Sequence, residues 1–190
     1  AKILENYIIP RYGKEMYAVY GMSMGGVLAA TLWQNRNLSF EKVIFDGSPL
    51  VSLNGFMKGF MKKFYLDITH KSQQRDKKTV EQATKVIIPE DKLEHLLRVL
   101  DNMSDATVTN SIDSIAEFKL KSDIATPNTT VYFFHGTAPN EMLAKKSAKY
   151  VQKHYPTTVI KRFSGKFHCE NALFHPEIMM EELNRILLIQ

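Results

Sequence analysis

Four short apolar segments, each rich in β-branched or aromatic residues, constrain the fold of this chain more than any other feature. Helical patterns follow three of them, because apolar side chains there recur every three or four residues. Strands that alternate with helices form a parallel sheet with helices on both faces. We therefore predict an α/β fold with a mostly parallel, doubly wound sheet. The expected strands are 16–20, 42–45, 130–134 and 158–163, and the expected helices are 24–33, 141–154 and one from Pro176 onward.

The composition narrows the class of protein. The 190 residues suit one domain that is large enough to bury a core. No apolar run approaches the roughly 18 to 20 residues that a membrane-spanning helix needs. Cys169 is the single cysteine, so it can form no internal disulfide. Because no signal peptide is visible either, we expect a cytoplasmic protein.

The first residues predict an amphipathic helix. Ile3, Leu4, Tyr7 and Ile8 fall on one helical face, and Pro10 is expected to end the helix because proline lacks a backbone N–H.

The stretch from 51 to 123 breaks the alternation and predicts helices only. Phe56, Phe60 and Phe64 recur at a spacing of four, and Ser104 is expected to cap a later helix. An insertion of this length exceeds a simple connection between strands. We therefore predict a helical cap or lid at 51–123, inserted into a core formed by 1–50 and 124–190.

The excess of positive charge is local. The chain has 25 Lys and Arg against 20 Asp and Glu, a net charge of +5. Between Lys58 and Lys85 there are eight basic and three acidic residues, which accounts for the whole excess. Such a run is typical of a solvated helix face, and no Gly-aromatic signature of nucleic-acid binding accompanies it. We therefore expect no nucleic-acid partner.

The segment Gly21-Met22-Ser23-Met24-Gly25 matches the pattern G-x-S-x-G between an expected strand and an expected helix. In that context the serine lies on a sharp turn with its hydroxyl above the sheet. We expect that side chains at 21 or 25 would press on the neighbouring backbone. The amide of Met24, at the start of the helix, is the candidate donor to a developing oxyanion.

This arrangement resembles the α/β-hydrolase fold family of serine esterases and lipases. In that family the triad follows the order serine, acid, histidine, and the histidine lies between the last strand and the last helix. The resemblance therefore implies that Ser23 is the nucleophile and His168 the base. It implies a carboxylesterase-like reaction on a small acyl substrate, without cofactor or metal.

The resemblance leaves two candidates for the acid. Glu141 is the only carboxylate in the loop after the third strand, and it precedes His168 by 27 residues. It could also be an ordinary first-turn acid that stabilises the helix dipole. Asp46, after the second strand, is the alternative.

The resemblance is incomplete at the beginning of the chain. Only 22 residues precede Ser23, whereas the family has several strands and a second oxyanion donor in that region. We therefore expect a C-terminal part of such a domain, whose sheet edge is completed by a further N-terminal segment.

The cap pattern bears on the substrate. Six apolar residues cluster on the first cap helix, and they form either the core of the cap or a surface facing Ser23 that would favour a substrate with an apolar portion. These residues are Phe56, Met57, Phe60, Met61, Phe64 and Tyr65.

Two other chemistries and two other functions are alternatives to a serine hydrolase. Cys169 has no elbow around it, and His168, Glu170 and His175 lack a recognisable ligand spacing, so neither a thiol nucleophile nor a metal site is predicted. The main alternative to an enzyme is a binding protein with a degraded triad, which the irregular acid loop favours. A nucleic-acid binder that uses residues 58–85 ranks last.

Overall fold

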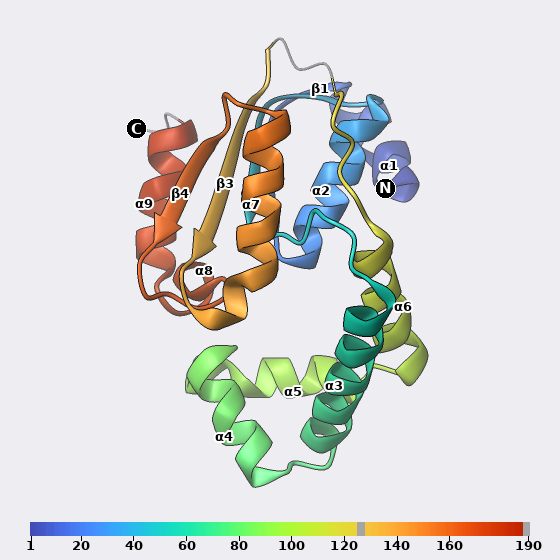
Figure 1. Ribbon diagram of the computed structural model, residues 1–190, viewed down its shortest axis with the longest axis vertical. Coiled ribbons are helices and arrows are strands. Elements are labelled where there is room, and N and C mark those ends of the chain that lie inside the picture. The colour runs from blue at the N-terminus through green and yellow to red at the C-terminus, as the bar shows by residue number, and fades with distance from the viewer. Residues whose placement is uncertain (125–127, 188–190) are drawn as a thin grey trace. The chain divides into compact units, whose positions relative to one another are not determined.

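The computed structural model describes residues 1–124 and 128–187, and the chain divides into two compact units (Figure 1). Unit 1 comprises residues 1–51 and 118–169, and unit 2 comprises the rest of the described chain.

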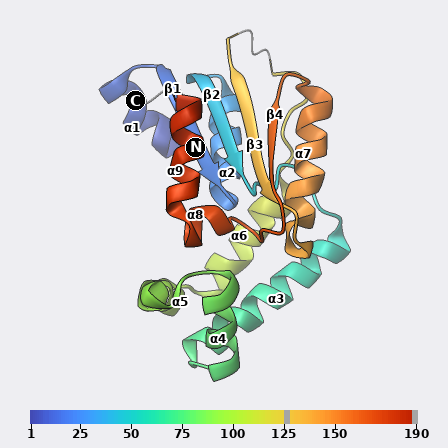
Figure 2. The same cartoon turned by 90° about the vertical axis from the view of Figure 1, so that its left-hand side faces the viewer.

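Unit 1 contains a four-stranded sheet in the order β1-β2-β3-β4, with every neighbouring pair parallel (Figure 2). In the register of β1 and β2, Met22 lies opposite Asp46, so the carboxyl ends of these two strands lie side by side. The predicted parallel sheet flanked by helices is confirmed. The strands are β1 (Glu15–Met22), β2 (Ser39–Asp46), β3 (Thr130–Gly136) and β4 (Val159–Phe163).

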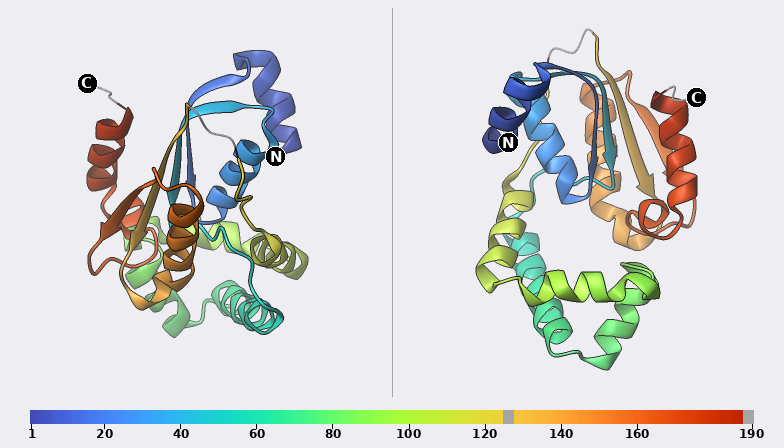
Figure 3. Two further views of the ribbon diagram at one scale, coloured as in Figure 1. Left: turned by 45° about the horizontal axis from the view of Figure 1, so that its top comes forward. Right: turned by 180° about the vertical axis from the view of Figure 1, so that it is seen from behind.

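Helices α2 (Met24–Asn35) and α7 (Met142–His154) lie on the same face of this sheet (Figures 1 and 3). Small residues of both helices and the aromatic residues of β2 and β3 form one buried cluster. Within this cluster the ring of Trp33 lies 6.3 Å from Phe45 and 5.1 Å from Tyr155, measured between centroids. Burial of this apolar surface fixes the positions of the strand ends on which the candidate site depends.

Helix α1 (Lys2–Tyr12) does not end at Pro10 as predicted. Proline removes one hydrogen bond, but here it lies in the last turn. The helix ends at Tyr12 and is followed by Gly13, which has a φ of 83°. The packed face also differs from the prediction, since Ile8 packs on the core while Ile3 is 85% exposed. That face includes Glu5, whose buried carboxylate accepts hydrogen bonds from Asn35 and Asn37 at 2.9 Å each. These two bonds offset the free-energy cost of burying the carboxylate.

Unit 2 consists of helices in the described residues. Helix α3 contacts α4, α5 and α6, and Leu97, Val108 and Ile112 are buried among them. Ser104 caps the N-terminus of the helix that begins at Asp105, as predicted, because its hydroxyl accepts a hydrogen bond from the Thr107 amide at 3.1 Å. The role of the insertion as a cap over the site stays a prediction. The helices are α3 (Gly55–Gln73), α4 (Lys77–Val86), η1 (Glu90–Lys92), α5 (Leu93–Asp101), α6 (Asp105–Glu117), α8 (Glu170–Phe174) and α9 (Pro176–Leu187).

The basic run of residues 58–85 forms many ion pairs inside unit 2. Lys58 lies 2.7 Å from both Asp113 and Glu117, and Lys62 lies 2.7 Å from Asp113. Five of the eight basic residues pair in this way, so much of the local charge is balanced. Among the described residues, no helix is long and apolar enough to cross a membrane.

The aromatic stripe of α3 is not the core of the insertion. Phe56, Phe60 and Phe64 are 82%, 59% and 47% exposed, so the expectation of an internal core is wrong for these residues. The reason is the orientation of α3. Lys58 and Lys62 face α6 through their ion pairs, and residues two positions away along a helix point to the opposite side.

Candidate active site

Ser23 lies on the turn between β1 and α2, with φ of 51° and ψ of −120°. A positive φ is uncommon for a residue with a side chain, and it costs free energy that surrounding contacts must offset. One such contact is the hydrogen bond from the Ser23 amide to the carbonyl oxygen of Asp46, at 2.7 Å. The neighbouring strand therefore holds the strained residue in place.

Two glycines permit this turn. A Cβ at Gly21 would lie 2.6 Å from the Cα of Gly26, and a Cβ at Gly26 would lie 1.8 Å from the hydroxyl of Ser48. Gly25 has no atom within 4 Å of such a Cβ, so the expectation that position 25 excludes a side chain is wrong. The close contact occurs one residue later because Gly26, not Gly25, faces the end of β1.

His168 lies in the loop between β4 and α8 and reaches Ser23 across 145 residues of sequence. Its Nε2 lies 2.9 Å from the Ser23 hydroxyl oxygen, and its Nδ1 lies 2.5 Å from Oε1 of Glu141. A neutral imidazole that donates from Nδ1 presents an acceptor at Nε2. This arrangement can therefore accept a proton from the hydroxyl of Ser23.

Glu141 lies at the end of the short helix η2 (Pro139–Glu141), directly before α7, and its side chain is fully buried. It is not an ordinary first-turn acid, because both of its carboxylate oxygens have specific partners. Oε1 faces His168, and Oε2 accepts the backbone amide of Gly136 at 2.9 Å. The structure thus brings together Ser23, His168 and Glu141, the three residues that the sequence analysis named.

Two loops that carry the acid and the histidine are bonded to each other. The amide of Gly165 donates to the hydroxyl of Thr137 at 2.7 Å, and the amide of Ala138 donates to the carbonyl of Lys166 at 3.0 Å. A Cβ at Gly136 would lie 2.1 Å from the same carbonyl oxygen. These contacts, which sequence reasoning missed, hold Glu141 and His168 at a fixed separation.

Asp46, the alternative acid, is also buried, but its carboxylate faces another group. It accepts a hydrogen bond of 2.8 Å from the hydroxyl of Tyr20, and it is 2% exposed. Burial raises the pKa of Asp46 to about 6, although the bond from Tyr20 and the charge of His168 favour ionisation. Burial likewise raises the pKa of Tyr20. Glu141, and not Asp46, therefore contacts Nδ1 of the imidazole.

Cys169 is buried beside the site, and its thiol contacts the carbonyl oxygen of Asp46 at 3.7 Å. Burial raises the pKa of this thiol, which disfavours the thiolate that a nucleophile would require. In the part of the chain that the structure describes, no group of three His, Cys, Asp or Glu side chains could hold a metal ion.

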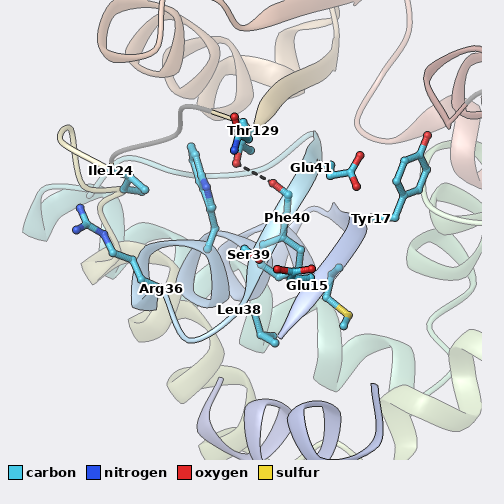
Figure 4. Close-up of a pocket in the computed structure, with 12 residues that line it drawn as sticks. Glu15, Tyr17, Arg36, Leu38, Ser39, Phe40, Glu41, Ile124 and Thr129 are labelled. Carbon is cyan, nitrogen blue, oxygen red and sulfur yellow. Dashed lines mark hydrogen bonds between the residues drawn. The ribbon is translucent and has the colours of Figure 1, made fainter. Parts of the chain in front are cut away.

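A pocket of about 660 Å³ lies at the amino-terminal ends of β1 and β2, as Figure 4 shows. Ser23 follows the carboxyl end of β1, about 20 Å away along an eight-residue strand. This pocket therefore contributes nothing to the arrangement around Ser23. Its lining residues are Glu15, Met16, Tyr17, Trp33, Arg36, Leu38, Ser39, Phe40, Glu41, Ile124, Asn128 and Thr129.

Comparison with known proteins gives structural matches and no sequence match. No family model and no curated protein sequence matches the chain. An α/β-hydrolase family protein of Desulfitobacterium hafniense superposes with a TM-score of 0.72 at 14% identity, covering 98% of this chain and 74% of that one. An esterase of Exiguobacterium antarcticum gives 0.69 at 16% identity, with coverages of 96% and 70%. MenH of S. aureus gives 0.63 at 14% identity, with coverages of 98% and 74%.

The chain has the α/β-hydrolase fold. Within this fold Ser23, Glu141 and His168 follow β1, β3 and β4 in that order along the chain. Identities of 14–16% establish the fold only, so activity must be argued from the geometry of the site.

Asp46 gives a test of site electrostatics that needs no substrate. The ordinary pKa of 3.8 rises to about 6 in the folded state, so between these values the folded chain keeps a proton that the unfolded chain releases. The free energy of unfolding therefore falls as the pH rises through this window. Asp46→Asn cannot ionise and keeps an oxygen that accepts from Tyr20. Relative to wild type, the variant should gain about 3 kcal/mol between pH 4 and 7, measured by urea unfolding.

The matched control is Glu41→Gln, which removes an exposed carboxylate from the same strand. It should leave the pH dependence of unfolding unchanged. An identical pH slope in wild type and Asp46→Asn would show that the Asp46 carboxyl ionises in the folded state as it does in the unfolded chain.

Proposed function

We propose that the chain is a serine hydrolase of the carboxylesterase type, which cleaves an ester or a related acyl bond. The observation that carries this proposal is the continuous set of contacts from Ser23 through His168 to Glu141, at 2.9 and 2.5 Å. Nucleophile, base and orienting acid within hydrogen-bond distance are the geometric signature of an activated serine. Esterases among the structural neighbours support the same reaction class.

The reaction proceeds in two stages. The Ser23 hydroxyl attacks the substrate carbonyl while Nε2 of His168 accepts its proton, and the imidazolium then protonates the leaving alcohol. Water hydrolyses the acyl enzyme with His168 acting again as base. The carboxylate of Glu141 keeps the Nδ1 proton in place and stabilises the imidazolium.

The amide of Met24 supplies one donor for the oxyanion. It occupies the first position of α2, where helix geometry provides no acceptor within the helix, and it follows the nucleophile directly. In such folds a second donor comes from a loop that precedes the nucleophile turn. We propose that a segment which pairs with the outer edge of β1 provides this donor and completes the sheet.

The insertion at 51–123 is proposed to act as a cap that supplies apolar surface for the acyl part of the substrate. The exposed aromatic stripe of α3, with stacked rings of Phe60 and Phe64 at 6.2 Å, supports this role. Apolar surface of this kind gains free energy by excluding water from a hydrocarbon chain.

Replacement of Ser23 tests the proposed function directly. A fluorophosphonate should label the wild-type protein at Ser23, identified by mass spectrometry of the modified peptide, because only an activated serine reacts. Ser23→Ala should lose labelling and lower kcat by roughly 10⁶-fold. Ser39→Ala, which removes an exposed hydroxyl from β2, is the control and should react normally. An unlabelled wild-type protein would favour a binding protein with an inactive triad.

A pair of variants decides between the two candidate acids. Glu141→Gln removes the charge that orients His168 and should lower kcat by about 10³- to 10⁴-fold. Asp46→Asn should keep most of the activity, because the Asp46 carboxylate bonds to Tyr20 and not to the imidazole. Ester hydrolysis rates measure both variants. The reverse ranking would assign the acid to Asp46.

Esters of increasing acyl length test the apolar part of the substrate. If each added methylene is buried, kcat/KM should rise by up to about fourfold per methylene until the surface is filled. Phe60→Ser should flatten this preference, whereas Val99→Ser, at another exposed apolar position in unit 2, should preserve it. A wild-type preference that is flat or falls with length would exclude the apolar surface from substrate binding.

A further inference from the structure

Gly47 lies directly after β2, and the imidazole of His168 occupies the space beside it. A Cβ at this position would lie 2.7 Å from Cε1 and 3.0 Å from Nδ1 of that ring. The residue also has a φ of 60°, and its amide donates to the carbonyl of Phe134 at 2.9 Å. The backbone at 47 is therefore fixed against β3, and it allows no side chain where the ring lies.

The same short segment also holds the nucleophile. The carbonyl oxygen of Asp46, one peptide bond before Gly47, accepts the amide of Ser23 at 2.7 Å. The Asp46 carbonyl thus contacts the backbone of Ser23, while the place that a Cβ of residue 47 would take lies against the ring of His168. The end of β2 therefore borders both Ser23 and His168, the two residues that must lie close together for proton transfer.

The hydrogen bonds of the imidazole do not by themselves fix its plane. Contacts at Nδ1 and Nε2 define a line through the ring, about which the ring could still tilt. Cε1 lies between the two nitrogens, and a Cβ at position 47 would lie 2.7 Å from it, on the edge that such a tilt would move. Cys169 follows with a φ of 53°, so the chain turns sharply directly after the histidine.

We propose that Gly47 is a positioning residue of the site, whose missing side chain lets the His168 imidazole lie in plane between Ser23 and Glu141. The expected effect on reaction rate rests on the proposed function, whereas the expected position of the His168 ring does not. Any side chain at 47 is expected to displace the imidazole from Ser23, although the substitution changes neither the Ser23 hydroxyl nor the His168 imidazole itself.

The test compares Gly47→Ala with Gly13→Ala. Both glycines have a positive φ, 60° and 83°, so both substitutions introduce backbone strain. Only position 47 has neighbours, since a Cβ at Gly13 meets nothing within 4 Å. Gly47→Ala should slow fluorophosphonate labelling of Ser23 by about 10²-fold or more, the effect of a displacement near 1 Å. Gly13→Ala should be labelled at the wild-type rate, and equal rates in both variants would overturn the proposal.

Nuclear magnetic resonance of the imidazole separates positioning from general destabilisation. The Nδ1 proton resonance of His168 should shift or disappear in Gly47→Ala and stay unchanged in Gly13→Ala. This readout needs no turnover. If the wild-type protein is not labelled, the proposed hydrolase fails, while the resonance still decides whether Gly47 positions the ring. An unchanged resonance in Gly47→Ala overturns the proposal.

Two double variants complete the experiment. The thiol of Cys169 would also lie 2.8 Å from the new Cβ, so Gly47→Ala with Cys169→Ala tests whether that contact is responsible. Labelling should stay slow, and recovery would assign the effect to Cys169. If Gly47→Ala does not fold, Gly47→Ala with His168→Ala should fold again because the obstructing ring is gone. Failure of this double variant to recover stability would contradict the proposed contact.

Discussion

The close approach of two backbones at the end of β1 is the constraint on which the site depends. A Cβ at Gly21 would lie 2.6 Å from the Cα of Gly26, so β1 can turn into α2 only because both positions lack side chains. This turn places Ser23 at a positive φ, and the bond from its amide to Asp46 holds it there. The strain at one residue is thus supported by pairing with the next strand.

The parallel sheet turns this local geometry into a site. Carboxyl ends of parallel strands lie along one edge, so residues that follow β1, β2, β3 and β4 converge although they are far apart in sequence. Ser23, Gly47, Glu141 and His168 each come from a different strand end. The buried cluster of α2, α7 and the sheet fixes these ends relative to one another.

Two buried carboxyls lie near one imidazole, and their surroundings assign them different tasks. Glu141 accepts the Gly136 amide and faces His168, so its negative charge can balance an imidazolium. Asp46 has the Tyr20 hydroxyl as its partner, and burial raises its pKa to about 6 despite the nearby histidine. Hydrogen-bond partners therefore distinguish the two carboxyls, since Glu141 contacts the imidazole and a backbone amide while Asp46 contacts a phenol hydroxyl.

Local signals in the sequence predicted the strands, the nucleophile turn and the capped helix at Ser104, because these depend on periodicity and on residues close in the chain. They failed at Pro10, where the helix continues for two residues, and at Gly25, where the close contact belongs to Gly26. Within the basic run, helix α4 was not predicted separately, although its ion pair between Lys77 and Glu81 joins residues only four apart.

The sequence by itself determined that strands alternate with helices, that Ser23 follows a strand, and that Glu141 and His168 are available after later strands. Only the tertiary structure decided that Glu141 and not Asp46 meets the imidazole, that Gly47 borders the ring, and that the aromatic stripe of α3 stays exposed. The physical reason is that such contacts depend on register and on packing of the core, which bring together residues whose separation along the chain carries no information about distance.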